Sequence, residues 1–126
     1  MHELGLAEIL VERACEEVAP ARVRRIVVEV GMLAAVLPDA LRFCFDIVTA
    51  GTAAEGASLE IRETPGEGRC RACGANVVLT RPFGRCACGC SDLEWLRGDE
   101  LRILAVEIGQ SNDHVCDLRM RPRSRA

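Results

Sequence analysis

The chain has 126 residues, 49% of them hydrophobic, and a formal net charge of −3. This length predicts one domain with a small module, or two small domains. The acidic balance argues against nucleic-acid binding, which usually needs a basic face, and no apolar run approaches the roughly 18 residues of a membrane span. The first residues, MHELGLAEIL, lack the basic segment and cleavage site of a signal peptide. We therefore expect a cytoplasmic protein whose thiols stay reduced.

The beginning of the chain has the pattern of a helix followed by a strand. From residue 4 to residue 19, apolar side chains recur every three or four positions, which predicts an amphipathic helix. Pro20 ends this helix, because proline cannot continue the hydrogen-bonded ladder. Residues 22–31 alternate between apolar and other positions, which is the period of a half-buried strand. The apolar positions on its inner face are Ile26, Val28 and Val30.

A second helix and a second strand follow. Pro38 suits the first turn of a helix, where its missing N–H costs nothing, and Gly51 suits the end of the same helix. Residues 57–63 alternate again and predict a strand. The sequence TPGEG at 64–68 then interrupts both patterns and predicts a hinge into a separate module.

The last predicted strand, residues 99–108, is apolar on both faces, which is typical of a central strand. The chain therefore leaves its first domain for a module and then returns to complete the sheet. We expect an α+β fold, in which a small mixed sheet carries two helices on one face and a zinc-ribbon-like module is inserted. The expected divisions are 1–68 and 99–109 for the α/β domain, 69–98 for the module and 110–126 for a disordered tail.

Five of the eight cysteines lie within residues 69–98. Cys70 and Cys73 form a C-x2-C pair, and after twelve intervening residues Cys86 and Cys88 form a C-x-C pair. Paired cysteines at such spacing, in a chain without a secretory signal, indicate a metal site rather than disulfides. Zn(II) takes four tetrahedral ligands, and two tight turns that each carry two thiolates can supply them.

The second pair has an alternative ligand, Cys90. Gly74 and Gly89 each follow the second cysteine of a pair, where glycine lets the turn adopt positive φ and point amides at the sulfurs. This shared ending favours Cys88 over Cys90 as the fourth ligand. Four protein ligands leave no open coordination position, so we expect a structural zinc. The module needs one, because about thirty residues with few large apolar side chains bury too little surface to fold alone.

The first three residues carry a second set of possible metal ligands. Met1 offers an α-amine, His2 an imidazole and Glu3 a carboxylate, and the backbone amides between them add further nitrogens. Nitrogen and oxygen donors of this kind favour a square-planar or tetragonal ion, Ni(II) or Cu(II), over Zn(II). By composition alone, however, a histidine at position 2 is more often part of a solvated terminus.

Four parts of the chain resemble the HypA/HybF family. They are MHELGLAEIL at the start, VEVGMLAAVLPDALRFCFDIVTAGTAAEGASLEI in the middle, the paired cysteines, and GDELRILAVEIG near the end. The resemblance extends from residue 1 to about residue 109. Members of this family are nickel metallochaperones that help to mature NiFe-hydrogenases and, in some organisms, urease. The resemblance therefore implies a metal-delivery protein rather than an enzyme.

The resemblance also implies roles for particular residues. It places a transient Ni(II) cargo on Met1, His2 and Glu3. It places a structural Zn(II) on Cys70, Cys73, Cys86 and Cys88. The second cysteine pair departs from the family's usual C-x2-C, because Arg85 stands where its first cysteine would be. The implied partners are a HypB-type GTPase and the hydrogenase large-subunit precursor, with this protein acting as a monomer or homodimer.

Two alternative interpretations use the same residues. One is a zinc-ribbon nucleic-acid binder, since the module contains five arginines and the tail is basic, although the acidic balance opposes it. The other is a structural interaction module in which His2 is incidental. Unchanged Ni(II) binding after His2→Ala would favour this second interpretation. An enzyme is the least expected class, because the chain has two histidines and shows neither a Ser-His-Asp arrangement nor a glycine-rich phosphate loop.

Overall fold

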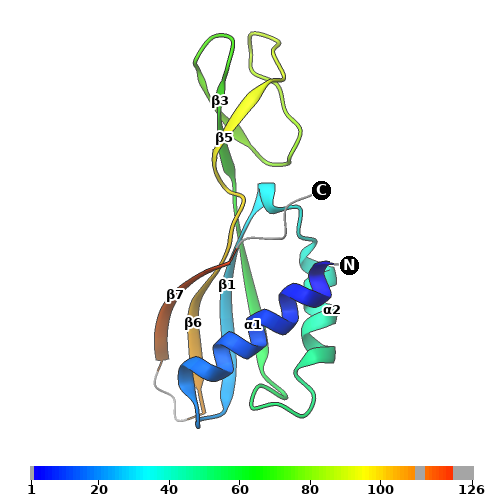
Figure 1. The fold of residues 1–126 in the computed structure, drawn as a ribbon, viewed down its shortest axis with the longest axis vertical. Coiled ribbons are helices and arrows are strands. Elements are labelled where there is room, and N and C mark those ends of the chain that lie inside the picture. The colour runs from blue at the N-terminus through cyan, green and yellow to red at the C-terminus, as the bar shows by residue number, and fades with distance from the viewer. Residues whose placement is uncertain (1, 110–112, 121–126) are drawn as a thin grey trace.

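The computed structural model of this chain describes residues 2–109 and the backbone of 113–120. The molecule is elongated, with a helix–sheet domain at one end and a module of three strands at the other (Figure 1). Among the described residues, no helix has the length and hydropathy needed to cross a membrane. In chain order the elements are α1 (His2–Val18), β1 (Val23–Gly31), the short 3-10 helix η1 (Met32–Ala34), α2 (Pro38–Val48), β2 (Ser58–Thr64), β3 (Gly66–Cys70), β4 (Asn76–Leu79), β5 (Leu93–Arg97), β6 (Leu101–Ile108) and β7 (Asp113–Met120).

The helix–sheet domain, which comprises residues 2–64 with β6 and β7, is built on a mixed sheet of order β2-β1-β6-β7. β1 pairs in parallel with β2 and antiparallel with β6. Both helices contribute to one core with the sheet, through residues such as Leu10 of α1 and Phe45 of α2. The α+β fold is therefore as predicted. Three fully buried cross-strand pairs form the sheet side of the core: Ile26–Val106, Val28–Ile103 and Val30–Leu101.

β6 lies inside the sheet, as predicted, but its apolar residues on both faces have a different cause from the one expected. The register to β1 shifts because Val28 pairs with Ile103 while Val27 pairs with Ala105, so Leu104 is the extra residue of a β-bulge. A bulge reverses the side-chain alternation beyond it. Ile103 and Val106 therefore both reach the core beneath the helices, although a regular strand would place them on opposite faces.

The expected disordered tail is wrong for residues 113–120. These residues form β7, which pairs antiparallel with β6 along the edge that β1 does not occupy. The physical reason is that an edge strand exposes unpaired N–H and C=O groups, and a following segment of chain can pair with them. Residues 110–112 and 121–126 lie outside the described residues.

The cysteine module, residues 66–97, is an antiparallel sheet of order β4-β3-β5. It begins at Gly66, so 66–68 belongs to this sheet rather than to the expected hinge. The junction is closely packed, because a Cβ on Gly66 would lie 2.4 Å from the Leu33 side chain, and a Cβ on Gly31 would lie 2.0 Å from the carbonyl oxygen of Gly98. The N–H of Leu33 also donates to that carbonyl at 2.8 Å. Glycines thus let the two parts meet backbone to backbone.

Candidate metal centres

Four cysteine side chains converge in the cysteine module. Cys70 ends β3, Cys73 follows in the turn to β4, and Cys86 and Cys88 lie in the loop between β4 and β5. Their sulfur atoms all lie within 4.8 Å of one another. The Sγ atoms of Cys70 and Cys88 are 3.6 Å apart, and those of Cys73 and Cys86 are 3.5 Å apart. Sulfurs bound tetrahedrally to zinc at about 2.3 Å lie about 3.8 Å from one another, so this cluster fits a tetrahedral ion.

Two tight turns position these thiols. The N–H of Gly74 donates to the carbonyl of Cys70 at 2.9 Å, and the N–H of Gly89 donates to the carbonyl of Cys86 at 2.8 Å. Gly74 has φ 79° and Gly89 has φ 96°, in the left-handed region that favours glycine. No atom lies within 4 Å of a Cβ built on either glycine, so backbone conformation rather than space requires glycine there. The positive φ predicted after each cysteine pair is confirmed.

Cys90 lies outside the group of four sulfurs. Its Sγ accepts the N–H of Asp92 at 3.4 Å, and its carbonyl accepts the N–H of Cys86 at 2.9 Å. Arg85, at the position where the family usually has a cysteine, donates from Nη1 to the carbonyl of Gly89 at 3.0 Å. Cys90 and Arg85 therefore support the turn, while the shorter C-x-C pair still brings its two sulfurs to the cluster.

Backbone amides and neighbouring thiols shift the pKa values of the clustered cysteines. The backbone amide of Cys73 lowers the pKa of Cys70 to about 6. The backbone amide of Cys90 lowers the pKa of Cys88, but the neighbouring thiols of Cys70 and Cys86 outweigh it and raise that pKa to about 12. Opposite shifts arise because four adjacent thiols resist becoming four thiolates unless a cation balances the charge. Metal binding at this cluster must therefore release protons.

At the other candidate site, two side chains meet at the start of α1. The Nε2 atom of His2 is buried and has no hydrogen-bond partner among the described residues. It lies 3.7 Å from Oε2 of Glu3, and the same oxygen accepts the N–H of Leu37 at 3.2 Å. Glu3 is only 8% exposed. Its carboxylate therefore ties α1 to the segment before α2, and Figure 1 shows these two helix ends side by side. Met1 lies outside the described residues.

The carboxyl of Glu3 is anionic at neutral pH. Burial raises its pKa, but hydrogen bonds from the backbone N–H groups of Leu37 and of Glu3 itself, with nearby positive charge, outweigh burial and hold the pKa below its usual range. The first N–H groups of a helix are not needed by its hydrogen-bonded ladder. The start of α1 thus brings an imidazole nitrogen and a carboxylate oxygen, two types of metal ligand, close together.

Sequence reasoning placed His2 and Glu3 together because they are adjacent, but it missed the contact with Leu37. That contact joins positions 34 residues apart. The one local signal is that Leu37 directly precedes Pro38 and is the N-cap residue of α2. A backbone amide at a helix start is available to an acceptor from elsewhere in the chain, yet no pattern in the sequence identifies Glu3 as that acceptor.

These features define a small α+β protein with a four-thiol metal centre on an inserted module and an imidazole–carboxylate pair at the start of its first helix. Residues 1–108 match the protein family described as "Hydrogenase/urease nickel incorporation, metallochaperone, hypA". The chain therefore belongs to the HypA family of nickel metallochaperones, which act in hydrogenase maturation. This result confirms the resemblance seen in the sequence and favours the metallochaperone interpretation over a nucleic-acid-binding module.

Individual relatives support the same assignment. The chain is 50% identical over 108 residues to the hydrogenase maturation factor HypA of Nostoc punctiforme, covering 86% of this chain and 96% of that protein. It is 45% identical over 113 residues to the HypA of Azotobacter vinelandii, covering 86% of this chain and 99% of that protein. The solution structure of the Ni metallochaperone HypA from Helicobacter pylori superposes with a TM-score of 0.59 at 21% identity, covering 86% and 97% of the two chains, and shows the same fold.

Proposed function

We propose that this protein binds Ni(II) at its N-terminus, through Met1, His2 and Glu3, and delivers it during the maturation of a NiFe-hydrogenase. The observation that carries this proposal is the buried, unpartnered Nε2 of His2 beside the anionic carboxylate of Glu3. An imidazole nitrogen without a hydrogen-bond partner, with a negative charge next to it, is suited to a cation. The family's role in nickel incorporation identifies that cation as Ni(II).

Delivery requires a site that binds nickel and then releases it. Imidazole, carboxylate and amine ligands at the end of a chain can be replaced one at a time by ligands of a receiving site. Nitrogen ligands bind a metal ion only in their unprotonated form, so nickel binding at such a site is coupled to pH. The hydrogen bond from Leu37 to Glu3 holds the carboxylate beside His2 before nickel arrives, which reduces the conformational entropy lost on binding.

We propose that Cys70, Cys73, Cys86 and Cys88 hold a structural Zn(II). Four thiolates at tetrahedral spacing suit zinc. When bound, the ion supplies a cross-link between the turn after β3 and the loop before β5, and four protein ligands leave no position for a reacting molecule. On this proposal zinc maintains the shape of the module, whereas nickel is carried and released.

The family assignment extends the proposal to partners. We propose that the protein works in the cytoplasm with a HypB-type GTPase and with the hydrogenase large-subunit precursor. Hydrogenase is the target that the relatives in Nostoc punctiforme and Azotobacter vinelandii carry in their names, while the family description includes urease as well. Co-purification of untagged protein with each purified candidate, in the presence and absence of Ni(II), measures these interactions directly.

The test of the nickel site is a calorimetric titration of untagged protein with Ni(II), with zinc counted in each sample. Three variants accompany the wild type: His2→Ala, a chain with one glycine added before Met1, and Glu12→Ala as a control on the exposed face of the same helix. We expect stoichiometric nickel binding by wild type and Glu12→Ala, loss in the other two, and unchanged zinc in all. Equal nickel binding by all four proteins would show that the N-terminus is not the site.

A further inference from the structure

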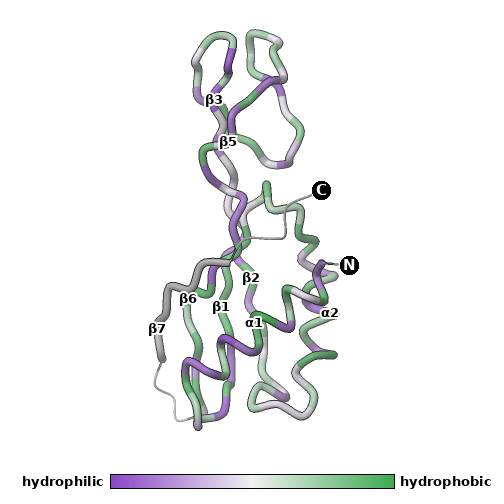
Figure 2. The backbone as a smooth tube through the Cα atoms, in the orientation of Figure 1, coloured by the Kyte–Doolittle hydropathy of each residue, from purple (hydrophilic) through white to green (hydrophobic). Residues whose placement is uncertain are grey.

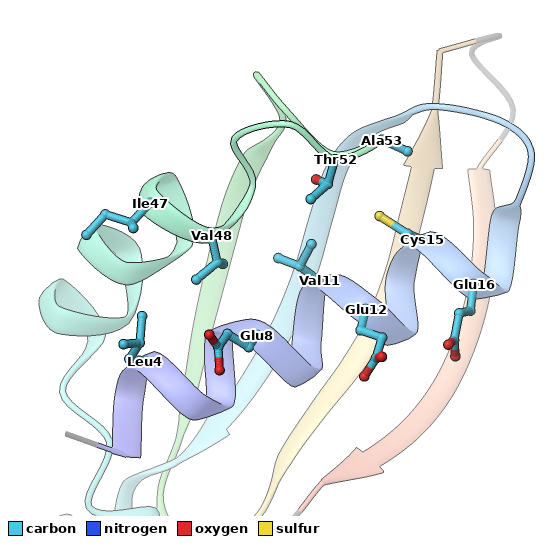
Figure 3. A pocket seen from close by; sticks show the side chains of 10 residues that line it. All are labelled: Leu4, Glu8, Val11, Glu12, Cys15, Glu16, Ile47, Val48, Thr52 and Ala53. Carbon is cyan, nitrogen blue, oxygen red and sulfur yellow. The ribbon is translucent and has the colours of Figure 1, made fainter.

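A groove of about 650 Å³ runs along α1 on the side that faces α2 and the loop after it (Figure 3). Its apolar lining comes from both helices. Leu4 is 41% exposed and Ile47 is 53% exposed. Exposed apolar side chains beside a concave surface are typical of a binding site for another molecule. The apolar residues that line this α1–α2 groove are Leu4, Val11, Ile47 and Val48.

Three carboxylates line the same groove. Glu8, Glu12 and Glu16 follow one another at every fourth position of α1, and Figure 3 shows them along one side of the helix. All three are exposed, and none forms an ion pair within residues 2–109. Like charges four residues apart in a helix repel each other. The helix therefore carries a row of unbalanced negative charge about 12 Å long.

We propose that the α1–α2 groove binds a basic amphipathic helix of a partner protein. A helix presents apolar side chains at spacings of three and four residues, which suits the apolar lining of the groove. Lysine or arginine one turn apart beside that apolar face would lie opposite the carboxylates, which are also one turn apart. The docked helix would pack between α1 and α2 as the third member of a helical layer.

The partner is a different protein rather than a second copy of this chain, because neither helix of the chain has a basic face. In the described residues of α1, Arg13 is the one arginine and there is no lysine, against five glutamates. In α2, Arg42 is the one arginine and stands against Asp39 and Asp46. A helix of a second copy would therefore bring further acidic residues to the groove. An anionic membrane surface would be repelled for the same reason.

The position of the groove matters for a protein that hands over a metal ion. Leu4, which lines one end of the groove, follows Glu3 directly in the chain. A helix that fills the groove would thus reach the N-terminal end of α1, beside the imidazole–carboxylate pair. Binding of a helix in the groove requires no metal, so it is independent of the proposed nickel site.

The probe for this proposal is a fluorescent amphipathic peptide of about 18 residues, a helix about 27 Å long, with leucine on one face and lysine on the other. Fluorescence anisotropy compares it with a leucine–glutamate peptide of the same pattern. We expect the lysine peptide to bind the full-length protein. The double change Glu8→Lys/Glu12→Lys should weaken it about tenfold or more and should give binding to the glutamate peptide instead.

Two further variants make the test specific. Glu63→Lys/Glu94→Lys changes the net charge by the same amount at exposed positions outside the groove, and it should leave binding of the lysine peptide unchanged. Ile47→Asp changes an exposed apolar residue of the lining, and it should weaken binding without affecting the fold. Equal binding of the lysine peptide to the two double variants would overturn the proposal, because it would show attraction by net charge alone.

A thiol reaction locates the bound peptide. Cys15 lines the groove, whereas Cys44 of α2 is not among its lining residues, and both are partly buried. The lysine peptide should slow the alkylation of Cys15 by iodoacetamide and leave Cys44 unchanged, as measured by mass spectrometry. If the peptide slowed the alkylation of both thiols equally, or slowed neither, that result would contradict binding in the groove. Self-association of the wild type that Glu8→Lys/Glu12→Lys abolishes, measured by sedimentation, would instead assign the groove to a second copy.

Discussion

The helix–sheet domain and the cysteine module reach a defined structure by different means. In the domain, a single cluster of eighteen buried apolar residues connects both helices with β1, β2 and β6. In the module, the buried apolar side chains are Cys70, Leu79 and Cys86, of which two belong to the four-sulfur cluster. Figure 2 shows the same contrast, since β1 and β6 are mainly hydrophobic while the module mixes both kinds of residue. Packing therefore stabilises the domain, whereas the module has few buried apolar side chains and would depend on the ion that we propose for its four cysteines.

The two candidate metal sites differ in a corresponding way. The cysteine cluster is formed by two local turns, each closed by hydrogen bonds within a few residues. The N-terminal pair is positioned by the long-range hydrogen bond between Leu37 and Glu3. Four thiolates on two turns form a closed site that retains its ion. The pair at the start of α1 lacks such closed turns, which suits the release of the nickel ion that we propose it carries.

The largest effect expected from this comparison follows removal of the metal from the cysteine module. Structural zinc contributes about 10–16 kcal/mol to the folding of small zinc peptides, and the module has little else to stabilise it. A strong chelator should therefore abolish hydrogen-exchange protection in β3, β4 and β5. Protection in β1 and β6 should persist, because their stability comes from the buried core of the helix–sheet domain.

Two cysteine variants provide a matched control for the chelation experiment. Cys73→Ser removes a member of the four-sulfur cluster and should reproduce the effect of the chelator. Cys90→Ser changes a thiol outside that cluster, so the protein should retain its zinc and its protection. If β1 and β6 lost protection at the same chelator concentration as β3, the two parts would form one cooperative unit, and the comparison between them would fail.

A smaller effect is expected from a change in the core of the helix–sheet domain. Phe45 of α2 is 1% exposed, and Phe45→Ala should lower the free energy of unfolding by about 3–5 kcal/mol through lost burial and the remaining cavity. Phe43 is on the same helix but 68% exposed, so Phe43→Ala should change the free energy of unfolding by about 0.5 kcal/mol or less. Urea denaturation followed by circular dichroism measures both. A loss of bound zinc in Phe45→Ala protein would contradict the independence of the module.

Local patterns in the sequence were sufficient to predict the two α-helices, three of the seven described strands (β1, β2 and β6) and the turn geometry at the cysteines. The alternation of Ile26, Val28 and Val30 identified the face of β1 that joins the hydrophobic core, although Val27 on the opposite face is buried as well. Gly74 and Gly89 predicted positive φ, because that conformation is a property of the single residue. Each of these features depends on residues that are close together in the chain.

Features that depend on distant partners could not be predicted in the same way. Because of the bulge at Leu104, residues that face the core stand at both odd and even positions of β6, so the sequence reads as a strand that is apolar on both faces. The bulge becomes visible only when β1 is paired with β6. The strand β7 forms along an edge that β6 provides, so the composition of the tail alone suggested disorder. The sequence favours Cys88 over Cys90 as a ligand only through the glycine that follows Cys88. The folded turn separates the two, because the Sγ of Cys88 lies in the four-sulfur cluster, whereas that of Cys90 accepts the N–H of Asp92.

The smallest effect concerns the hydrogen-bonded carboxylate of Glu3. Its pKa is held below the ordinary value of 4.5 in the folded protein, so the unfolded chain binds a proton more readily than the folded one. Ionised Glu3 therefore contributes stability above the unfolded pKa, and that contribution is lost as the pH falls through the folded pKa. The difference in unfolding free energy between wild type and Glu3→Gln, without nickel, should stay constant from about pH 8 to pH 6 and shrink below about pH 4.5.

Urea denaturation at each pH measures this difference, and Glu12→Gln serves as the control for loss of one carboxylate on the exposed face of α1. Because zinc loss in acid affects wild type and both variants alike, it cancels when they are compared at the same pH. A difference for Glu3→Gln that persists unchanged to about pH 3 would mean that the contact with Leu37 does not favour the charged carboxyl. The negative charge that we propose for nickel binding would then have no support from the fold, and His2 alone would have to attract the ion.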